Sequence, residues 1–346
     1  MSKQTDRAVD VALVGAGPIG LEMAVALKRA GVDYVHLEAG QIGQTIAGFP
    51  REMHFYSSND RIAIAGLPLV TTDESKATRE QYLGYLRQVA RREALAIRSY
   101  EPVTGIAREG EHYLLRSHSL AGPRETPARR VILALGGTHR PRRLGIPGED
   151  LLHVSHQFVE PHPYFGQRLL VVGGRNSAVE AALRCWHAGA QVALSYRRAA
   201  FDRKAVKYWL LPELEGRIAR GEIEGHLATQ PVAIEPGRAL LRRADGETYA
   251  VAADFVLLLT GYEADTSLNR QLGLALEGEE QAPVLDPDTM ESSLPGVYVI
   301  GTATAGTQQR FQIFLENCHV HVDRVLAALT GRPAPDAPAP LERPES

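Results

Sequence analysis

The stretch that decides the fold is DVALVGAGPIG, residues 10–20. Its first six residues, DVALVG, predict a buried strand, and PIGLEMAVALKRA at 18–30 predicts a helix with a proline in its first turn. Gly31 ends the helix, and DYVHLE at 33–38 predicts the next strand. Together these segments indicate a β–α–β unit at the start of the chain.

The turn inside this unit reads G-x-G-x-x-G, with Gly15, Gly17 and Gly20 at the glycine positions. Glycines there permit a tight turn and let backbone N–H groups approach a phosphate, and the helix that begins at Pro18 points its positive end at the same place. Glu38 ends the second strand, where an acid accepts both hydroxyls of a ribose. The pattern predicts a site for an adenine dinucleotide. The alternative is a glycine-tolerant turn with a solvated acid.

A second unit of the same kind opens with VVGGRNSAVE, residues 171–180. A strand at 168–173 and a helix at 176–188 are followed by a strand at 191–197, which indicates a duplicated nucleotide fold. Arg175 stands where the middle glycine belongs, so it either blocks a nucleotide or pairs with its pyrophosphate. We expect Asn176 and Ser177 to cap this helix or to donate to phosphate.

The second strand of this unit ends in Tyr196, Arg197 and Arg198, without an acid. An acid would repel a 2′-phosphate, whereas arginines pair with one, so the sequence favours NADPH over NADH. The alternative places these arginines at a solvated strand end.

The rest of the chain fits an α/β protein. A helix is predicted at 80–95 and a last helix at 312–329. Further strands are predicted at 101–118, 128–137, 254–262 and 297–303. Residues 331–346 are rich in proline and are expected to be disordered.

Composition sets the class of protein. The chain has 346 residues, 44% of them hydrophobic and 23% charged, which is typical of a soluble protein of about two domains. A net charge of −3 gives no sign of nucleic-acid binding, and no apolar run is long enough for a membrane helix. The N-terminus shows no signal peptide and the two cysteines, Cys185 and Cys318, lie far apart, so a cytoplasmic protein is expected.

Three glycine segments together resemble FAD-dependent pyridine-nucleotide reductases: the early G-x-G-x-x-G, VILALG at 131–136, and LPGVYVIGTATAG at 294–306. The resemblance implies that the late segment lies along the flavin ribityl chain. It also implies that the next helix presents its first amides, those of Gln312 and Ile313, to the flavin ring. Thr302 replaces the aspartate usual after the late glycine.

More specifically, the chain resembles the low-molecular-weight thioredoxin-reductase-like flavoproteins, in the branch of the bacillithiol disulfide reductases. The stretches that carry this match are FYSSNDRI (55–62), GGRNSAVEAAL (173–183), VKYWLLP (206–212), LLTGYEAD (258–265) and FLENCHVH (314–321). A basic residue at the position of Arg175 is common in that branch, which favours NADPH binding there. The resemblance implies a homodimer and reduction of the disulfide of a small thiol.

The predicted fold class is therefore α/β, with two Rossmann-like, three-layer ββα domains and the NADPH domain inserted into the FAD domain. The expected boundaries are 1–157 with 290–330 for FAD and 158–289 for NADPH. The residues assigned to FAD are Gly15, Gly17, Pro18, Gly20, Glu38, Gln44, Ser57, Val103, Gly136, Gly301, Gln312 and Ile313. Those assigned to NADPH are Gly173, Gly174, Arg175, Asn176, Ser177, Arg197, Arg198 and Gly261.

The catalytic residues are left open. Ile19 stands where several members of the family have a reactive cysteine, and the chain lacks a C-x-x-C pair. Cys318 is a weak substitute, because free cysteines are more often inert and buried. His54 is either a proton shuttle or an ordinary surface or core histidine. His319 and His321 lie two apart on a helix, on different faces, so no metal site is expected.

The sequence thus predicts an enzyme that passes a hydride from NADPH to FAD and electrons onward to a small-molecule or small-protein acceptor, without a redox-active protein disulfide. One alternative is a reductase of ferredoxin or flavodoxin. Another is a flavin-binding redox sensor with little turnover.

Overall fold

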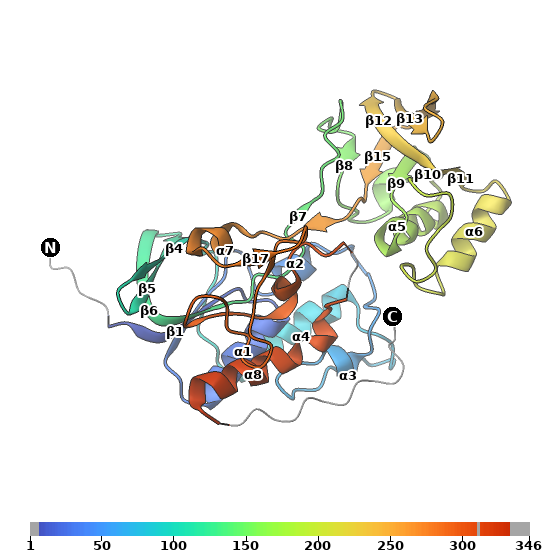
Figure 1. Cartoon of the computed structure of the whole chain (residues 1–346). Coiled ribbons are helices and arrows are strands. Elements are labelled where there is room, and N and C mark those ends of the chain that lie inside the picture. Colours follow the sequence, from blue (N-terminus) through green and yellow to red (C-terminus); the bar gives the residue numbers. More distant parts are fainter. Residues whose placement is uncertain (1–6, 310–311, 333–346) are drawn as a thin grey trace. The chain divides into compact units, whose positions relative to one another are not determined.

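The computed structural model describes residues 7–309 and 312–332, which form two compact units (Figure 1). The first unit comprises residues 1–140 and 263–346, and the second comprises 141–262. One unit is therefore inserted into the other, as the sequence predicts. All but the first two residues of the expected disordered tail lie outside the described residues.

The first unit is built on a parallel sheet with an antiparallel extension. The strands run in the order β3-β2-β1-β6-β5-β4, and β19 pairs with β6. Strands β1, β2, β3 and β19 are parallel to the strands they pair with here, while β4 and β5 form a hairpin on the first half of β6. The strand bounds are Val9–Val14 (β1), Tyr34–Leu37 (β2), Ile97–Arg98 (β3), Val103–Glu109 (β4), His112–Ser119 (β5), Gly122–Leu133 (β6) and Val297–Val299 (β19).

The alternation of side chains along β1 separates the two faces of this sheet. Val11 and Leu13 pack with α1 (Pro18–Arg29) and α8 (His319–Thr330). Ala12 and Val14, on the other face, belong to a core that includes residues of β4, β5, β6 and α7 (Ser267–Leu272). Helix α4 (Arg79–Arg92) packs against α1 (Figure 1). The short elements of the unit are α2 (Gln44–Ala47), α3 (Asn59–Ile62), β17 (Leu276–Glu277), β18 (Ala282–Pro283), η2 (Gly301–Ala305) and η3 (Leu315–Asn317).

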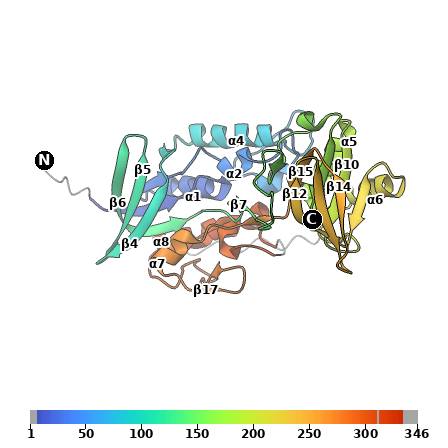
Figure 2. The same ribbon diagram turned by 90° about the horizontal axis from the view of Figure 1, so that it is seen from above.

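The second unit has three layers. A parallel sheet in the order β11-β10-β9-β15-β8 lies between the helices and an antiparallel sheet, β12-β13-β14 (Figure 2). Leu169 and Val171 face the helices, while Leu170 and Val172 face the antiparallel sheet. The strands are β8 (Val154–Ser155), β9 (Arg168–Val172), β10 (Gln191–Tyr196), β11 (Glu224–Leu227), β12 (Thr229–Glu235), β13 (Arg238–Arg243), β14 (Thr248–Ala252) and β15 (Phe255–Leu258). The helices are η1 (His162–Tyr164), α5 (Asn176–His187) and α6 (Leu211–Ala219).

The observed division differs from the predicted boundaries at both ends of the insertion. Strand β8, predicted to belong to the first domain, pairs with β15 and so belongs to the second unit. Helix α7, predicted to belong to the second domain, contacts β4 and so belongs to the first. The chain crosses between the units at residues 140–141 and 262–263, where β7 (Arg140–Pro141) and β16 (Tyr262–Glu263) lie.

The last predicted helix is also shorter than expected. Residues 312–314 are not helical, and the regular helix starts only at His319, after the single 3-10 turn of η3. Within the described ranges, no helix has the length and apolar character needed to cross a bilayer.

Candidate functional site

The first glycine turn depends on contacts that leave no room for side chains. Gly15 has a φ of +104°, and a Cβ on it would lie 2.4 Å from the carbonyl oxygen of Ala134, the residue after β6. A Cβ on Gly20 would lie 2.0 Å from the carbonyl oxygen of Gly15. Helix α1 therefore approaches the turn closely only because both positions are glycine.

Gly17 has a different role, because it faces open space. A Cβ on this residue would meet no atom within 4 Å, and its backbone is extended, with φ −71° and ψ 179°. Gly17 is the N-cap of α1, and Pro18 follows it as the first helical residue. The first amides of a helix carry partial positive charge and lack internal partners. The cradle that a side chain would fill thus fits the pyrophosphate of a dinucleotide.

Glu38 lies beside this turn with 8% of its surface exposed. Its carboxylate accepts the amide hydrogens of Ala16 at 2.6 Å and Gly40 at 2.8 Å, which fixes its orientation. A carboxylate has about four acceptor positions, so two remain for ribose hydroxyls. Val103 starts β4 two residues after Glu101, whose amide donates to the Glu38 carbonyl at 2.9 Å.

His36 is a residue of this site that the sequence analysis did not assign. It is fully buried on β2, and its Nε2 lies 2.9 Å from the carbonyl oxygen of Gly15, so that nitrogen donates. Burial lowers the pKa of His36 to about 4, against the weaker opposing effect of the bond to Gly15. A neutral imidazole thus braces the turn at Gly15. The sequence signal for this role was a histidine inside a predicted buried strand, two residues before Glu38.

A second buried histidine braces the late glycine segment. Gly301, with a φ of +73°, donates its amide hydrogen to Nδ1 of His321 at 3.2 Å. Burial chiefly lowers the pKa of His321 to about 4, helped by the nearby charges of Arg324 and His319. A Cβ on Gly301 would lie 3.5 Å from Cβ of Ile19, so this segment passes close to the first turn of α1. The early and late glycine segments therefore lie close to each other in the first unit.

The prediction for Gln312 and Ile313 is wrong in its geometry. These residues do not begin a helix, and both of their amides already have hydrogen-bond partners. Both donate to the side-chain oxygen of Gln308, at 2.8 and 2.9 Å, and the Gln308 amide donates to the Ile313 carbonyl at 2.9 Å. The Gln308 side-chain oxygen accepts hydrogen bonds from two consecutive amides. A carbonyl oxygen of a flavin ring is the same kind of acceptor. The pair of amides thus remains a fitting anchor, but loop geometry presents it.

Three further residues assigned to FAD make the following contacts. Gly136 has a φ of +77° and would place a Cβ 4.0 Å from the hydroxyl of Thr302. Gln44 begins α2 and accepts the amide hydrogen of Gln41 at 3.2 Å. Ser57 donates its hydroxyl hydrogen to Glu316, a contact that ties the 55–62 stretch to η3.

A buried ionic network surrounds that contact. Glu316 lies 3.5 Å from Arg61, and both side chains are largely buried. His319 lies 2.7 Å from Glu22 through Nδ1 and 3.0 Å from the Arg61 carbonyl through Nε2. Burial alone would lower the pKa of His319, but the bond to Glu22 and its charge outweigh burial and raise it. This network joins α1, α3, η3 and α8.

The two catalytic candidates, Cys318 and His54, lie in opposite surroundings, one buried and one exposed. Cys318 is completely buried, and its thiol donates to the Phe314 carbonyl at 2.9 Å. Burial raises the pKa of Cys318 to about 12, and burial also raises the pKa of Cys185 to about 12. Since the thiolate is the reactive form, both thiols are inert at neutral pH. His54 is exposed, and its Nδ1 lies 2.8 Å from the carbonyl of Lys76.

The second glycine turn repeats the first. A Cβ on Gly173 would lie 2.5 Å from the carbonyl oxygen of Leu259, the residue after β15. A Cβ on Gly174 would lie 2.3 Å from the ring of Tyr196, so the aromatic ring covers this position. Gly261 has a φ of +106° and faces open space.

Arg175 does not obstruct the backbone of this turn. It is the N-cap of α5, its φ of −116° and ψ of −178° are extended, and its side chain is exposed. Any residue adopts that conformation, so a glycine is not required there for geometry. Ser177 is exposed on the first turn of α5, while the side-chain oxygen of Asn176 accepts the amide hydrogen of Lys207 at 2.8 Å. No side-chain cap bond forms at the start of α5.

The two arginines after β10 differ in their surroundings. Arg198 lies 3.6 Å from the carboxylate of Asp202. Arg197 lines a hollow of the second unit together with residues of β12 and β13. In the part of the chain that the structure describes, no group of three or more His, Cys, Asp or Glu residues is arranged for a metal ion.

Comparison with known proteins adds the family context. The sequence pattern of the pyridine nucleotide-disulphide oxidoreductases matches residues 12–301. Bacilliredoxin reductase Bdr of Bacillus subtilis is 31% identical over 320 residues, which cover 92% of this chain and 97% of that protein. A ferredoxin–NADP reductase of Ignicoccus hospitalis is 27% identical over 303 residues, covering 85% of this chain and 90% of that protein.

A solved structure agrees with the fold. Bacillithiol disulfide reductase Bdr of Bacillus cereus has a TM-score of 0.89 and 30% identity, covering 94% of this chain and 100% of that chain. The predicted fold class, two Rossmann-like domains in one chain, and the predicted resemblance are thereby confirmed.

We predict that Gly17→Ala leaves the protein folded but removes most of its flavin. The new Cβ meets no protein atom, whereas it occupies the cradle over the first amides of α1. Flavin content after gel filtration and FAD affinity of flavin-free protein measure this, with an expected loss of affinity of at least about tenfold. The matched control is Gly84→Ala, whose Cβ meets only the end of the Arg87 side chain at 3.8 Å. Equal flavin content in both variants would refute the assignment of the cradle.

We predict that His36 makes stability depend on pH. The folded-state pKa of about 4 lies below the ordinary value of 6.5, so the unfolded chain binds a proton first as pH falls. The contribution of neutral His36 to the free energy of unfolding is fully present above about pH 6.5. It decreases as the pH falls toward 4, by up to about 1.4 kcal/mol per pH unit. Urea unfolding of His36→Phe should give a shallower decline between pH 6.5 and 4.5, while the exposed control His118→Phe matches wild type. Parallel curves for wild type and His36→Phe would contradict this.

Proposed function

Because the chain belongs to the pyridine nucleotide-disulphide oxidoreductase family, we propose that it is an NADPH-dependent FAD oxidoreductase that reduces the disulfide of a small thiol compound. In balanced form, NADPH, one proton and the disulfide give NADP⁺ and two thiols. Bound FAD supplies the acceptance of a hydride and the release of two electrons. The chain supplies binding, orientation and exclusion of water.

The observation that carries this proposal is the pair of glycine turns with one geometry and two different surroundings. In the first unit, Glu38 lies at the end of the second strand, ready for ribose hydroxyls. In the second unit, Tyr196 takes that place and Arg197 follows it, which suits a phosphorylated ribose. One chain thus holds a site for each of two adenine coenzymes, FAD in the first unit and NADPH in the second.

The chain's own residues have static tasks in this reaction. We assign the pyrophosphate of FAD to the Gly15–Gly20 turn, its ribose to Glu38, and the ribityl chain to the segment at Gly301. The amides of Gln312 and Ile313 would hold a flavin carbonyl in place of Gln308. We assign the pyrophosphate of NADPH to residues 173–177, with the exposed Arg175 on its charge.

The acceptor is inferred from the relatives. Two of them, at 31% and 30% identity over more than nine tenths of this chain, are named bacilliredoxin reductase and bacillithiol disulfide reductase. Both cysteines of this chain are buried and held as thiols, so we propose that electrons leave without a protein sulfur relay. A cytoplasmic homodimer is part of the same proposal, on the resemblance alone.

A reductase of ferredoxin is the second candidate. The Ignicoccus hospitalis relative carries that name, and the chemistry of such a reductase requires no cysteine. The inert thiols of this chain are compatible with it. The choice between the two depends on the acceptor and not on the coenzyme sites.

We predict that NADPH bleaches the bound flavin within seconds under anaerobic conditions, in stopped-flow absorbance at the flavin band. Protein reduced with one equivalent of NADPH should then be reoxidised by low-molecular-weight disulfides. Reoxidation by ferredoxin and not by any disulfide would select the second candidate. Absence of bleaching within minutes would overturn both and leave a flavin-binding sensor.

We predict that Cys185→Ala combined with Cys318→Ser retains turnover within about twofold of wild type. Serine preserves the hydrogen bond to the Phe314 carbonyl, so the packing of α8 changes little. The measurement is steady-state NADPH oxidation with the acceptor found above, together with thermal unfolding as a control for folding. A loss of more than about tenfold in a folded variant would show that a thiol takes part.

A further inference from the structure

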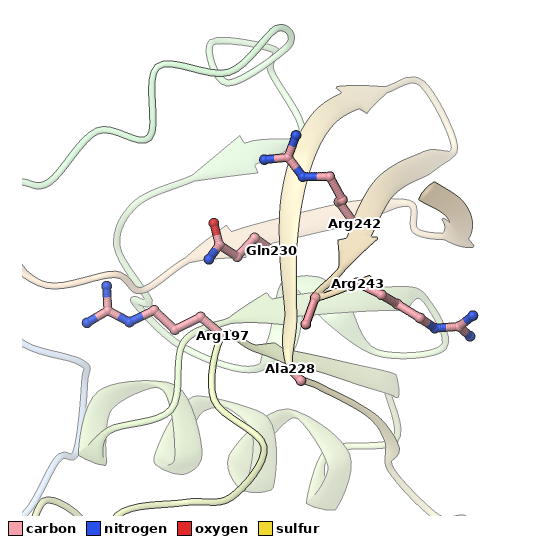
Figure 3. A pocket seen from close by; sticks show the side chains of 6 residues that line it. Arg197, Ala228, Gln230, Arg242 and Arg243 are labelled. Carbon is pink, nitrogen blue, oxygen red and sulfur yellow. The ribbon is translucent and has the colours of Figure 1, made fainter. Parts of the chain in front are cut away.

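The second unit contains a basic hollow that lies beside the end of β10. It has a volume of about 240 Å³ and is drawn in Figure 3. Its lining residues are Arg197, Ala228, Gln230, Arg242, Arg243 and Ala244. They come from three separate segments of the sequence, next to the end of β10, the start of β12 and the end of β13. No local sequence motif therefore predicts the hollow.

Two hydrogen bonds attach β12 to the end of β10 and so create this arrangement. The amide of Ala228 donates to the Arg198 carbonyl at 2.9 Å, and the hydroxyls of Thr229 and Ser195, both buried, lie 2.9 Å apart. Ala228 adopts a left-handed φ of +53° to make the turn between β11 and β12. Strand β12 therefore starts next to the residues that follow β10.

Strand register then decides which side chains share the hollow. Gln230 of β12 pairs directly with Arg242 of β13, so their side chains lie on the same face of the sheet. The next pair, Thr229 with Arg243, faces the other way. Figure 3 shows Arg243 extending in the opposite direction from Arg197 and Gln230.

The charges of the nearby arginines are not equally available. Arg243 is bonded to Glu247 and stacks over the ring of Tyr249 at 4.4 Å. Arg198 is paired with Asp202. In contrast, the guanidinium groups of Arg197 and Arg242 have no hydrogen bond or ion pair with any other residue that the structure describes, and no acid lines the hollow.

We propose that Arg242, with Gln230 and Arg197, binds the 2′-phosphate of NADPH and sets the preference for NADPH over NADH. This inference rests on the proposed function. The adenine ribose of a dinucleotide lies at the end of the second strand of its unit, which is where Arg197 stands. A phosphate monoester carries close to two negative charges at neutral pH, which two free guanidinium groups match. The amide of Gln230 donates between them without adding charge.

The proposal changes the role expected for Arg198. The tandem arginines suggest from sequence that both bind the 2′-phosphate, but Arg198 already pairs with the Asp202 carboxylate at 3.6 Å. Arg242, distant in sequence, supplies the missing positive charge. Specificity for the phosphate thus depends on the antiparallel sheet that covers the unit as well as on the nucleotide fold itself.

The test measures binding of three probes to the full-length protein by titration calorimetry: 2′,5′-ADP, 5′-ADP and inorganic phosphate. Arg242→Gln should weaken binding of 2′,5′-ADP about tenfold, the loss of a charge-assisted bond, while binding of 5′-ADP stays unchanged. Arg197→Gln should behave similarly. The matched control is Arg238→Gln at the other end of β13, where the arginine pairs with Glu235 at 2.6 Å outside the hollow. Arg198→Gln should show less than about a threefold effect.

The outcomes separate this inference from the proposed function. Weakening by Arg197→Gln and Arg198→Gln, without an effect of Arg242→Gln, would overturn the inference and leave the NADPH site standing. Equal affinity for inorganic phosphate and 2′,5′-ADP, both weakened by Arg242→Gln, would show a general anion site and overturn the assignment to the coenzyme. If NADPH also fails to bleach the flavin, the proposed function fails as well. Thermal unfolding of each variant verifies that it is folded.

Discussion

The structure depends on one steric constraint that occurs twice: a turn must pass within contact distance of the carbonyl after a neighbouring strand. Gly15 meets this demand at Ala134, and Gly173 meets it at Leu259. In each unit the turn donates to the second strand, from Gly15 to Leu37 at 2.8 Å and from Gly173 at 2.9 Å. A side chain at either glycine would separate the helix from the sheet. The distance between the sheet and the start of the helix follows from this contact.

Within that shared frame, the side chain at the carboxyl end of the second strand distinguishes the two units: Glu38 directly follows β2, and Tyr196 is the last residue of β10. Glu38 directs its carboxylate back to the amide of Ala16, whereas Tyr196 lays its ring over Gly174. Beside the first turn lies a buried carboxylate, whereas beside the second turn an aromatic ring is followed by the exposed Arg197 and Arg198. One backbone arrangement thus carries side chains of opposite charge in the two units. Duplication of the frame with changes at a few side chains is sufficient for this.

Much of this organisation was predictable from the sequence, because glycine spacing and apolar periodicity report local backbone geometry directly. The helices starting at Pro18 and Asn176 begin where the sequence analysis places them. The start of α8 was not predictable, since a side chain, Gln308, replaces helical bonding at residues 312–313. Gln230 and Arg242 are joined by the register of distant strands, which no local pattern encodes. The observed division differs from the expected boundaries for the same reason. Strand β8 has only two residues, so the sequence does not indicate its pairing with β15.

The burial of both cysteine thiols has a consequence for the response of the protein to oxidants. Oxidants and electrophiles attack cysteines that are exposed and ionised, in a sequence that ends in irreversible acids. Cys185 and Cys318 are neither exposed nor ionised at neutral pH. A burst of peroxide that poisons a reductase with a catalytic thiol would therefore find no vulnerable nucleophile in the described part of this one. Such a catalyst would continue to draw on NADPH while sulfur-dependent systems recover.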